Sequence, residues 1–274
     1  MELEFAKMHG AGNDFMVVRW PKGVDLPDGE IVRDWADRRR GVGFDQLLIL
    51  EEAEQPGLAA FYRIFNSDGS EVEQCGNGVR CIARYLAGDV EGTTMTLGSP
   101  VGAVEVRLLS GGEVTVNLGE PLYAPEALPF QVNTESDRYL LELNNETVEF
   151  GAVSMGNPHA VIQVNSVETA PVGILGPALR SHPSFPEEVN VGFMEVRDST
   201  RVRLRVVERG AGETRACGTG AAAAVAVGRL WGFLEDRVRV ELTGGTLQVQ
   251  WLGPGHSLWL SGPATRVFEG RIEL

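Results

Sequence analysis

The sequence of 274 residues is poor in cysteine and lysine and contains no long apolar segment. Its cysteines, Cys75, Cys81 and Cys217, are odd in number and form no C-x-x-C motif, which argues against a disulfide framework and a structural zinc site. No apolar run approaches the roughly 20 residues of a membrane-spanning helix. The segment MELEFAKMHG lacks the basic and apolar regions of a signal peptide, so we expect a cytoplasmic protein.

Basic residues are also scarce relative to acidic ones. The formal net charge is −14 and the sequence pI is about 4.8. Nucleic acids and anionic membranes are polyanions, so this charge argues against both as partners. It is compatible with a small anionic substrate, because backbone N–H groups supply positive potential locally.

Short motifs recur in the same order in the two halves of the chain, at a nearly constant spacing of 142 to 144 residues. This recurrence indicates two similar lobes, residues 1–119 and 120–263. The last residues, 264–274, lie beyond the second copy, and we expect them to return to the first lobe. The matched pairs are Asn13 and Asn157, Gln46 and Asn190, Asn66 and Glu208, Cys75 and Cys217, and Pro121 and Pro263.

Most segments alternate between apolar and polar residues, as in MVVRW, FYRIFN, HAVIQV and RVRLRVVE, and are typical of strands. Helices are predicted only at residues 30–40, 76–87 and 218–231. The third is apolar on every side, so it should be buried all round. We predict an α+β fold with two pseudo-symmetric lobes, each a mostly antiparallel sheet rolled around a central helix. The active site is expected in the cleft between the lobes.

Cys75 and Cys217 each precede a Gly-x-Gly at the start of a predicted helix. The first N–H groups of a helix lack internal acceptors and carry partial positive charge, so they bind carboxylates and stabilise thiolates. A small buried cysteine is the structural alternative at either position taken alone. Two equivalent positions in a duplicated chain favour chemistry instead.

Two thiols on opposite faces of one carbon suit the inversion of a stereocentre. One thiolate removes the α-proton, and the opposite thiol returns a proton to the other face. A thiol is suited to this work because its pKa can be tuned towards neutrality, where general acid–base catalysis is most efficient.

The blocks MHGAGNDF, FNSDGSEVEQCGNGVRC, MGNPHAV and ERGAGETRACGTGAAAA resemble the signature blocks of the diaminopimelate epimerase family. The resemblance covers almost the whole chain in order. It implies an isomerase that interconverts LL- and meso-2,6-diaminopimelate for lysine and peptidoglycan precursor synthesis. It further implies that neither pyridoxal phosphate nor a metal is needed. A homodimer is known in the family, and the sequence itself leaves the oligomeric state open.

The resemblance also implies roles for individual residues. Cys75 and Cys217 would be the acid–base pair, while the N–H groups of Gly76, Asn77, Gly218 and Thr219 hold the reacting carboxylate. Asn13 and Gln46 would hold the reacting amine, and His159 and Glu208 would tune the pKa values of the thiols. The distal amino-acid end of the substrate would be bound by Asn66, Asn157, Asn190, Glu208 and Arg209.

Each of these residues also has a structural interpretation. Asn13 and Asn157 follow glycines and could be turn residues, His159 could be a core histidine, and Glu208 with Arg209 could be a surface ion pair. Cys81 is expected in the core. Two other functions remain open: a proline or hydroxyproline racemase, and a thiol redox switch or metal-binding protein. Racemases of that kind have CGHG at the first site, where this chain has Asn77.

Overall fold

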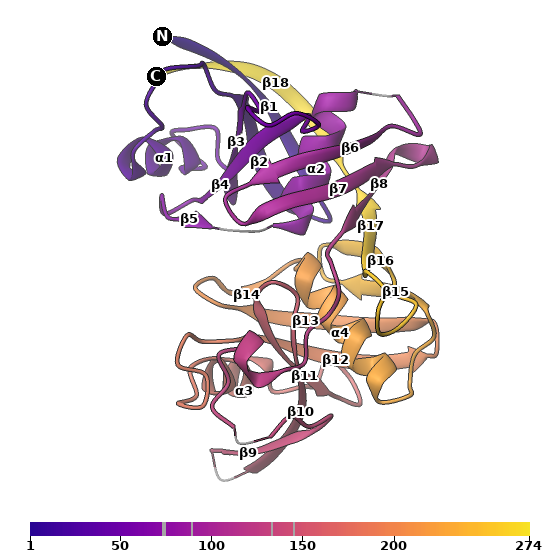
Figure 1. Ribbon diagram of the computed structural model, residues 1–274. Helices are drawn as coiled ribbons and strands as arrows, with labels where there is room; N and C mark the ends of the chain where they lie inside the picture. Colours follow the sequence, from indigo (N-terminus) through magenta and orange to yellow (C-terminus); the bar gives the residue numbers. More distant parts are fainter. Residues whose placement is uncertain (73–74, 89, 133, 145) are drawn as a thin grey trace. The chain divides into compact units, whose positions relative to one another are not determined.

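The computed structural model describes residues 1–72, 75–88, 90–132, 134–144 and 146–274 (Figure 1). It divides into two compact units. Unit 1 comprises Met1–Asn117 and Ser261–Leu274, and unit 2 comprises Leu118–Leu260. Within the described residues, no helix has both the length and the apolar character needed to cross a membrane.

Unit 1 is built mainly of strands around the helix α2, Gly76–Ala87. A second helix, α1, spans Gly29–Ala36. The strands are β1 (Glu2–Gly10), β2 (Asn13–Arg19), β3 (Gln46–Glu51), β4 (Ala60–Asn66), β5 (Glu71–Val72), β6 (Thr94–Ser99), β7 (Gly102–Leu108), β8 (Glu113–Asn117) and β18 (Thr265–Glu273). A short strand, β17 (Trp259–Pro263), carries the chain back into this unit.

Unit 2 is likewise built mainly of strands with two helices, α3 (Val172–Arg180) and α4 (Gly218–Leu230). Its strands are β9 (Tyr139–Leu143), β10 (Glu146–Ser154), β11 (Pro158–Gln163), β12 (Asn190–Asp198), β13 (Arg201–Glu208), β14 (Gly212–Thr214), β15 (Arg237–Leu242) and β16 (Gly245–Gln250).

The two units repeat one order of strand pairings. In unit 1, β1–β2 is antiparallel, β2–β3 parallel, β3–β4 antiparallel, β4–β6 parallel and β6–β7 antiparallel. In unit 2, the pairs β10–β11, β11–β12, β12–β13, β13–β15 and β15–β16 follow the same sequence of directions. Even the register is repeated, since Phe15 pairs with Gln46 and His159 with Asn190. The predicted α+β fold with two similar lobes is therefore confirmed.

In each unit, the first strand of the repeated order, β1 or β10, also pairs with a strand that does not belong to that order. In unit 1, β18 pairs antiparallel with β1, with Phe5 opposite Gly270, and Figure 1 shows the yellow C-terminal strand alongside the indigo N-terminal one. In unit 2, β9 precedes β10 in the chain and pairs with it antiparallel.

Each unit has one helix at its core. Strands β1, β2, β3, β7, β8 and β18 contact α2, and strands β10, β11, β12, β13 and β16 contact α4. Every residue from Gly218 to Gly228 is buried, as the apolar composition of this segment predicts. Alanine and glycine keep α4 thin enough for strands to surround it.

A second helix covers the outer face of each sheet. Val32 and Trp35 of α1 pack with strand residues such as Met16 and Leu47, while Val172 and Leu179 of α3 pack with strand residues of unit 2. Central strands are therefore buried on both faces and read as continuous apolar runs.

Two predictions about helices need correction. The helix predicted at 30–40 ends at Ala36, because Asp37 takes extended backbone and its carboxylate accepts hydrogen bonds from the N–H groups of Arg39 and Arg40. The helix α3 was not predicted at all. It contains Pro177, which lacks an N–H group and disfavours a helix interior.

Candidate active site

Cys75 and Cys217 occupy the N-cap positions of α2 and α4. The sulfur of Cys75 accepts a hydrogen bond from the Gly78 N–H at 3.4 Å, and that of Cys217 accepts one from the Gly220 N–H at 3.3 Å. Each thiol therefore sits on the positive end of a core helix. Cys75, Cys81 and Cys217 are thiols that form no disulfide among the described residues.

Glycine at the third helical position allows this close approach. A Cβ atom built on Gly220 would lie 3.2 Å from the sulfur of Cys217 and 3.1 Å from Val206. On Gly78 it would lie 3.0 Å from Leu48. The second glycine of Cys-Gly-x-Gly therefore leaves room for the thiol at Gly220 and for Leu48 at Gly78.

Three side chains meet in unit 1 at what we call the Cys75 site: Cys75, Asn13 and Asn77. The thiol of Cys75 contacts Asn13 Oδ1 at 3.7 Å, and Asn77 Nδ2 donates to the same oxygen at 3.4 Å. The parallel pairing of β2 and β3 brings Asn13 next to the residues that precede Gln46. Asn13 is thus a site residue with defined side-chain contacts in addition to its turn position.

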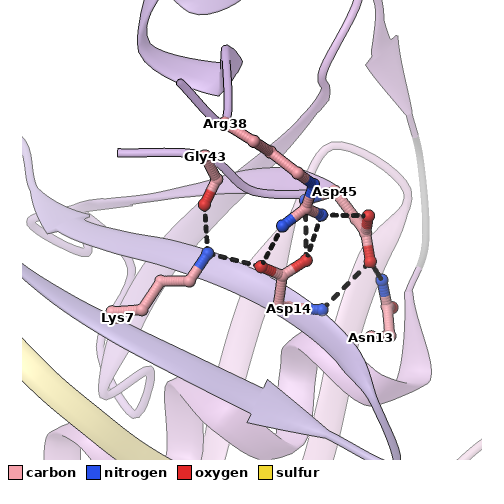
Figure 2. A network of polar contacts seen from close by, with 6 residues as sticks. All are labelled: Lys7, Asn13, Asp14, Arg38, Gly43 and Asp45. Atoms are coloured by element: carbon pink, nitrogen blue, oxygen red, sulfur yellow. Dashed lines mark hydrogen bonds and ion pairs between the residues drawn. The ribbon is translucent and has the colours of Figure 1, made fainter. Parts of the chain in front are cut away.

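Asn13 is hydrogen-bonded to a network of charged groups (Figure 2). Asn13 Nδ2 donates to Asp45 Oδ2 at 3.0 Å, and Asp45 Oδ1 accepts from Arg38 at 2.8 Å. Arg38 also binds both oxygens of Asp14, at 2.7 and 2.9 Å. Lys7, one of the two lysines, is buried and donates to Asp14 and to the carbonyl oxygen of Gly43.

The network fixes the charge of Asp14. Burial alone would raise the pKa of Asp14, but hydrogen bonds from Arg38, Lys7 and Asp45 outweigh it and hold that pKa well below its usual range. The carboxylate is therefore ionised wherever the protein is folded near neutrality, and it neutralises the buried ammonium of Lys7.

Asp14→Asn is expected to lower the free energy of unfolding by about 3 kcal/mol, because it leaves the Lys7 ammonium buried without its counter-charge. A carboxylate whose pKa is depressed by folding stabilises the fold above its unfolded pKa of about 3.9, and loses that effect as the pH falls through the lower folded value. The difference between wild type and variant should persist from neutrality to about pH 4 and shrink below it. Urea denaturation at a series of pH values measures this.

The pair Lys22 and Glu52 provides the matched control, since both side chains are mostly exposed. Glu52→Gln should change the unfolding free energy by less than about 0.5 kcal/mol. An equally small effect of Asp14→Asn would show that the network does not carry the stability argued here.

Gln46 and Asn66 lie opposite each other on β3 and β4. Gln46 Nε2 donates to Asn66 Oδ1 at 3.0 Å, and Asn66 Nδ2 donates to Ser70 Oγ at 3.2 Å. Gln46 Oε1 is buried and has no hydrogen-bond donor among the described residues. A buried acceptor of this kind is unusual in a folded protein.

The Cys217 site of unit 2 consists of Cys217, Thr219, Asn157 and Glu208. Thr219 Oγ1 lies 3.6 Å from the sulfur and 3.4 Å from Asn157 Nδ2. Asn157 Oδ1 contacts Nε2 of His159 at 3.0 Å. Thr219 thus has the place that Asn77 has in the Cys75 site.

Burial strongly raises the pKa of Cys217, and the neighbouring, hydrogen-bonded Glu208 carboxylate raises it further. Hydrogen bonds from Thr219 and the Gly220 N–H lower it, but burial and Glu208 dominate. Cys217 is therefore protonated at neutral pH in this structure.

His159 is buried and neutral. Burial, together with the positive charge of Arg209, lowers its pKa to about 3. Its ring contacts Asn157 rather than the sulfur, and its influence on the thiol stays a prediction.

The remaining predicted residues gather where β12 begins and β13 ends. Asn190 Nδ2 donates to the carbonyl oxygen of Pro158 at 2.9 Å, and Asn190 Oδ1 accepts from the N–H of Arg209 at 2.9 Å. Thr214 donates its hydroxyl hydrogen to Glu208. The exposed guanidinium of Arg209 reaches only the carbonyl oxygen of Glu187, at 3.4 Å, among the described residues. Glu208 and Arg209 therefore do not form the surface ion pair of the structural alternative.

Within unit 1, the described contacts thus join Cys75, Asn13 and Asn77 in one group and Gln46 and Asn66 in another. Within unit 2, they join Cys217, Thr219 and Asn157. Sequence reasoning missed Lys7, Arg38, Asp14 and Asp45, although Asp14 and Asp45 are direct neighbours of Asn13 and Gln46. Cys81 is a core residue, as predicted, and burial raises its pKa to about 12. Within the described part of the chain, no three His, Cys, Asp or Glu side chains gather as metal ligands.

Comparison with known proteins gives one family and one fold. A model of the family described as diaminopimelate epimerase matches residues 5–124 and 151–267. The hydroxyproline epimerase of Agrobacterium vitis is similar in structure, with 17% identity, a TM-score of 0.68 and coverage of 99% of this chain and 92% of that one. A probable proline racemase of Agrobacterium radiobacter K84 has 15% identity, a TM-score of 0.71 and coverage of 99% and 93%. A predicted epimerase of Pseudomonas aeruginosa has 16% identity, a TM-score of 0.70 and coverage of 98% and 99%.

Proposed function

Because the chain belongs to the diaminopimelate epimerase family, we propose that it interconverts LL- and meso-2,6-diaminopimelate in the cytoplasm, for lysine and peptidoglycan synthesis. The family and the solved structures of this fold include epimerases, racemases and isomerases, which supports an isomerase. The observation that carries the proposal is the pair of thiols at equivalent N-cap positions, of which Cys75 contacts Asn13 and Cys217 contacts Thr219, itself bound by Asn157. The homodimer expected from the resemblance is part of the proposal.

The proposed reaction is a proton transfer at the α-carbon. A thiolate takes the α-proton and becomes a thiol, and the electron pair of the broken C–H bond moves towards the substrate carboxylate. The second thiol gives its proton to the opposite face and becomes a thiolate. The reaction requires that Cys75 and Cys217 reach one substrate carbon from opposite sides.

The N–H groups that begin α2 and α4 would stabilise the intermediate. They belong to Gly76, Asn77, Gly218 and Thr219, and the first N–H groups of a helix lack intrahelical acceptors. Negative charge that develops on the carboxylate would meet these fixed dipoles without reorganisation.

Polar groups near the thiols suit the rest of the substrate. The buried Oε1 of Gln46 needs a donor, and an ammonium group would supply one. The exposed guanidinium of Arg209 matches a distal carboxylate, and Glu208, Asn66, Asn157 and Asn190 supply further polar groups for the distal amine and carboxylate.

The second candidate is a proline or hydroxyproline racemase, which the similarity to the Agrobacterium vitis enzyme supports. Asn77 in place of histidine favours diaminopimelate. The N-cap positions of both thiols, on the positive ends of the core helices, favour acid–base chemistry over a redox switch.

The test is incubation of the protein with LL-diaminopimelate in deuterated water, with a reductant. We expect meso-diaminopimelate with deuterium at the inverted α-carbon. Chiral chromatography and mass spectrometry detect this product. Parallel reactions contain L-proline, trans-4-hydroxy-L-proline, a chelator, or an oxidised sample. Turnover of either proline substrate without turnover of diaminopimelate would reverse the assignment, while loss with the chelator or full activity after oxidation would contradict the two-thiol mechanism.

A further inference from the structure

Arg80 is a completely buried cation in α2, one turn beyond Cys75. Its guanidinium is bound only by neutral oxygen atoms, and no carboxylate among the described residues is within ion-pair distance. The acceptors are the carbonyl oxygen of Gly76 at 3.3 Å, Asn77 Oδ1 at 2.8 Å and the carbonyl oxygen of Pro263 at 3.5 Å. A buried charge without a counter-ion is costly, so it needs a reason.

The surroundings of Arg80 are shaped to hold it. A Cβ atom on Gly10, at the end of β1, would lie 3.2 Å from Arg80 Nη2 and 3.3 Å from the carbonyl oxygen of Pro263. Gly10 therefore leaves room for the guanidinium. Arg80 in turn orients the amide of Asn77, whose Nδ2 binds Asn13 at the Cys75 site.

The charge of Arg80 is permanent. Burial lowers its pKa, but a guanidinium starts from about 12.5 or higher and stays protonated in proteins. Negative charge is therefore favoured on any group nearby that can ionise. The titratable groups whose charges act on Arg80 are Cys81, Cys75 and Glu113.

Of these groups, Cys75 is the one at the start of α2, where Arg80 binds the carbonyl oxygen of Gly76 and Gly78 donates to the sulfur. Cys81 is buried, with its pKa raised to about 12, and Glu113 is exposed on β8, where solvent screens it. Tyr62 is a further ionisable side chain on which the charge of Cys75 acts; it is buried, and burial raises its pKa to about 12. Both Cys81 and Tyr62 therefore stay neutral.

The contact from Asn13 acts in the opposite direction. Asn13 Oδ1 is an acceptor and favours a protonated sulfur, but its 3.7 Å distance from Cys75 makes this a weak hydrogen bond. The Gly78 N–H donates to the sulfur and so favours the thiolate. The attraction between the Arg80 guanidinium and a thiolate acts in the same direction, because the interaction between full charges falls off slowly with distance.

The Cys217 site has the reverse electrostatics. Ala222 has the position in α4 that Arg80 has in α2, five residues after the cysteine, and it is completely buried. The charged group next to the sulfur of Cys217 is the carboxylate of Glu208. One thiol therefore has a buried cation behind it, and the other has an anion beside it.

We propose that Arg80 is a positioning residue that stabilises the thiolate of Cys75, so that in the resting protein Cys75 is the base and Cys217 the acid. The roles of base and acid rest on the two-thiol function proposed above, whereas the thiolate on Cys75 does not. The resting protein is then prepared to remove a proton from one face of the substrate only.

The test compares Arg80→Gln, which keeps hydrogen-bond donors but removes the charge, with Arg80→Lys, which keeps the charge. Alkylation of Cys75 by iodoacetamide is followed over a range of pH by peptide mass spectrometry, which reads Cys217 separately in the same sample. Arg80→Gln should move the midpoint for Cys75 up by about one pH unit, so that alkylation at a pH below both midpoints slows about tenfold. Arg80→Lys should remain close to wild type, and the profile of Cys217 should not move.

An unchanged Cys75 profile in folded Arg80→Gln, or an equal shift in both variants, would overturn the proposal. Circular dichroism and thermal melting establish folding. If Arg80→Gln does not fold, a second experiment that keeps Arg80 tests the proposal. The ultraviolet thiolate absorbance of the wild-type protein is compared with that of Cys75→Ala and Cys217→Ala at neutral pH. The absorbance should be lost in Cys75→Ala and kept in Cys217→Ala, and the opposite pattern would overturn the proposal whether or not the protein acts on diaminopimelate.

Discussion

Alanine at either Cys75 or Cys217 is expected to reduce epimerisation at least about 1000-fold, since each direction of inversion needs both a base and an acid. Serine at either position should leave only slight turnover, because a hydroxyl is a far weaker acid than a thiol at neutral pH. The rate at which LL-diaminopimelate becomes the meso isomer, resolved by chiral chromatography, measures the effect.

Cys81→Ala is the matched control for these variants. Cys81 lies in the same helix as Cys75, is fully buried and, among the described residues, forms no side-chain hydrogen bond with the Cys75 site. This variant should keep most of the wild-type rate, with a modest loss of stability from the smaller side chain. Inversion at the wild-type rate by Cys75→Ala or Cys217→Ala would contradict the two-thiol mechanism.

Arg209→Met is expected to reduce kcat/KM for diaminopimelate about 100-fold, mainly through KM. The exposed guanidinium is free of an ion pair with the described carboxylates, and a charge-assisted bond to the distal carboxylate is worth about 2–3 kcal/mol. Steady-state kinetics with both stereoisomers gives the two constants. Arg209→Lys should recover part of the loss, because an ammonium keeps the charge but not the two-pronged geometry.

A second measurement tests the effect of the Arg209 charge without relying on turnover. Its positive charge contributes to the low pKa of His159, so Arg209→Met should raise that pKa, as followed by NMR of the imidazole. Arg237→Met, at an exposed arginine on β15, is the control and should change neither constant. Unchanged KM in Arg209→Met would remove this residue from the substrate site.

Local signals predicted the core helices well. Cys-Gly-x-Gly gave the start of α2 and α4, and the composition of α4 gave its burial. Helix α3 escaped prediction because VGILGPALR contains glycine and proline, which disfavour a helix. It forms through tertiary packing: Gly176 lies so close to β13 that a Cβ atom there would meet Val207 at 2.5 Å.

Motifs located the thiols and their asparagines, but they did not show what supports those residues. Asp14 and Asp45 become neighbours only through the parallel pairing of β2 with β3, and Lys7 reaches them from β1. No sequence motif singles out Arg80. Its burial depends on Gly10 and Pro263, which come from opposite ends of the chain.

The strand that covers β1 has a consequence for synthesis on the ribosome. Unit 2 carries its own covering strand, β9, ahead of β10, so all of its pairings can form once Leu260 has emerged. Unit 1 is translated first, yet the backbone edge of β1 facing β18 stays without its partner until the final residues are made. An open strand edge invites pairing with other chains, so the nascent first unit is the part that most needs a chaperone while translation is completed.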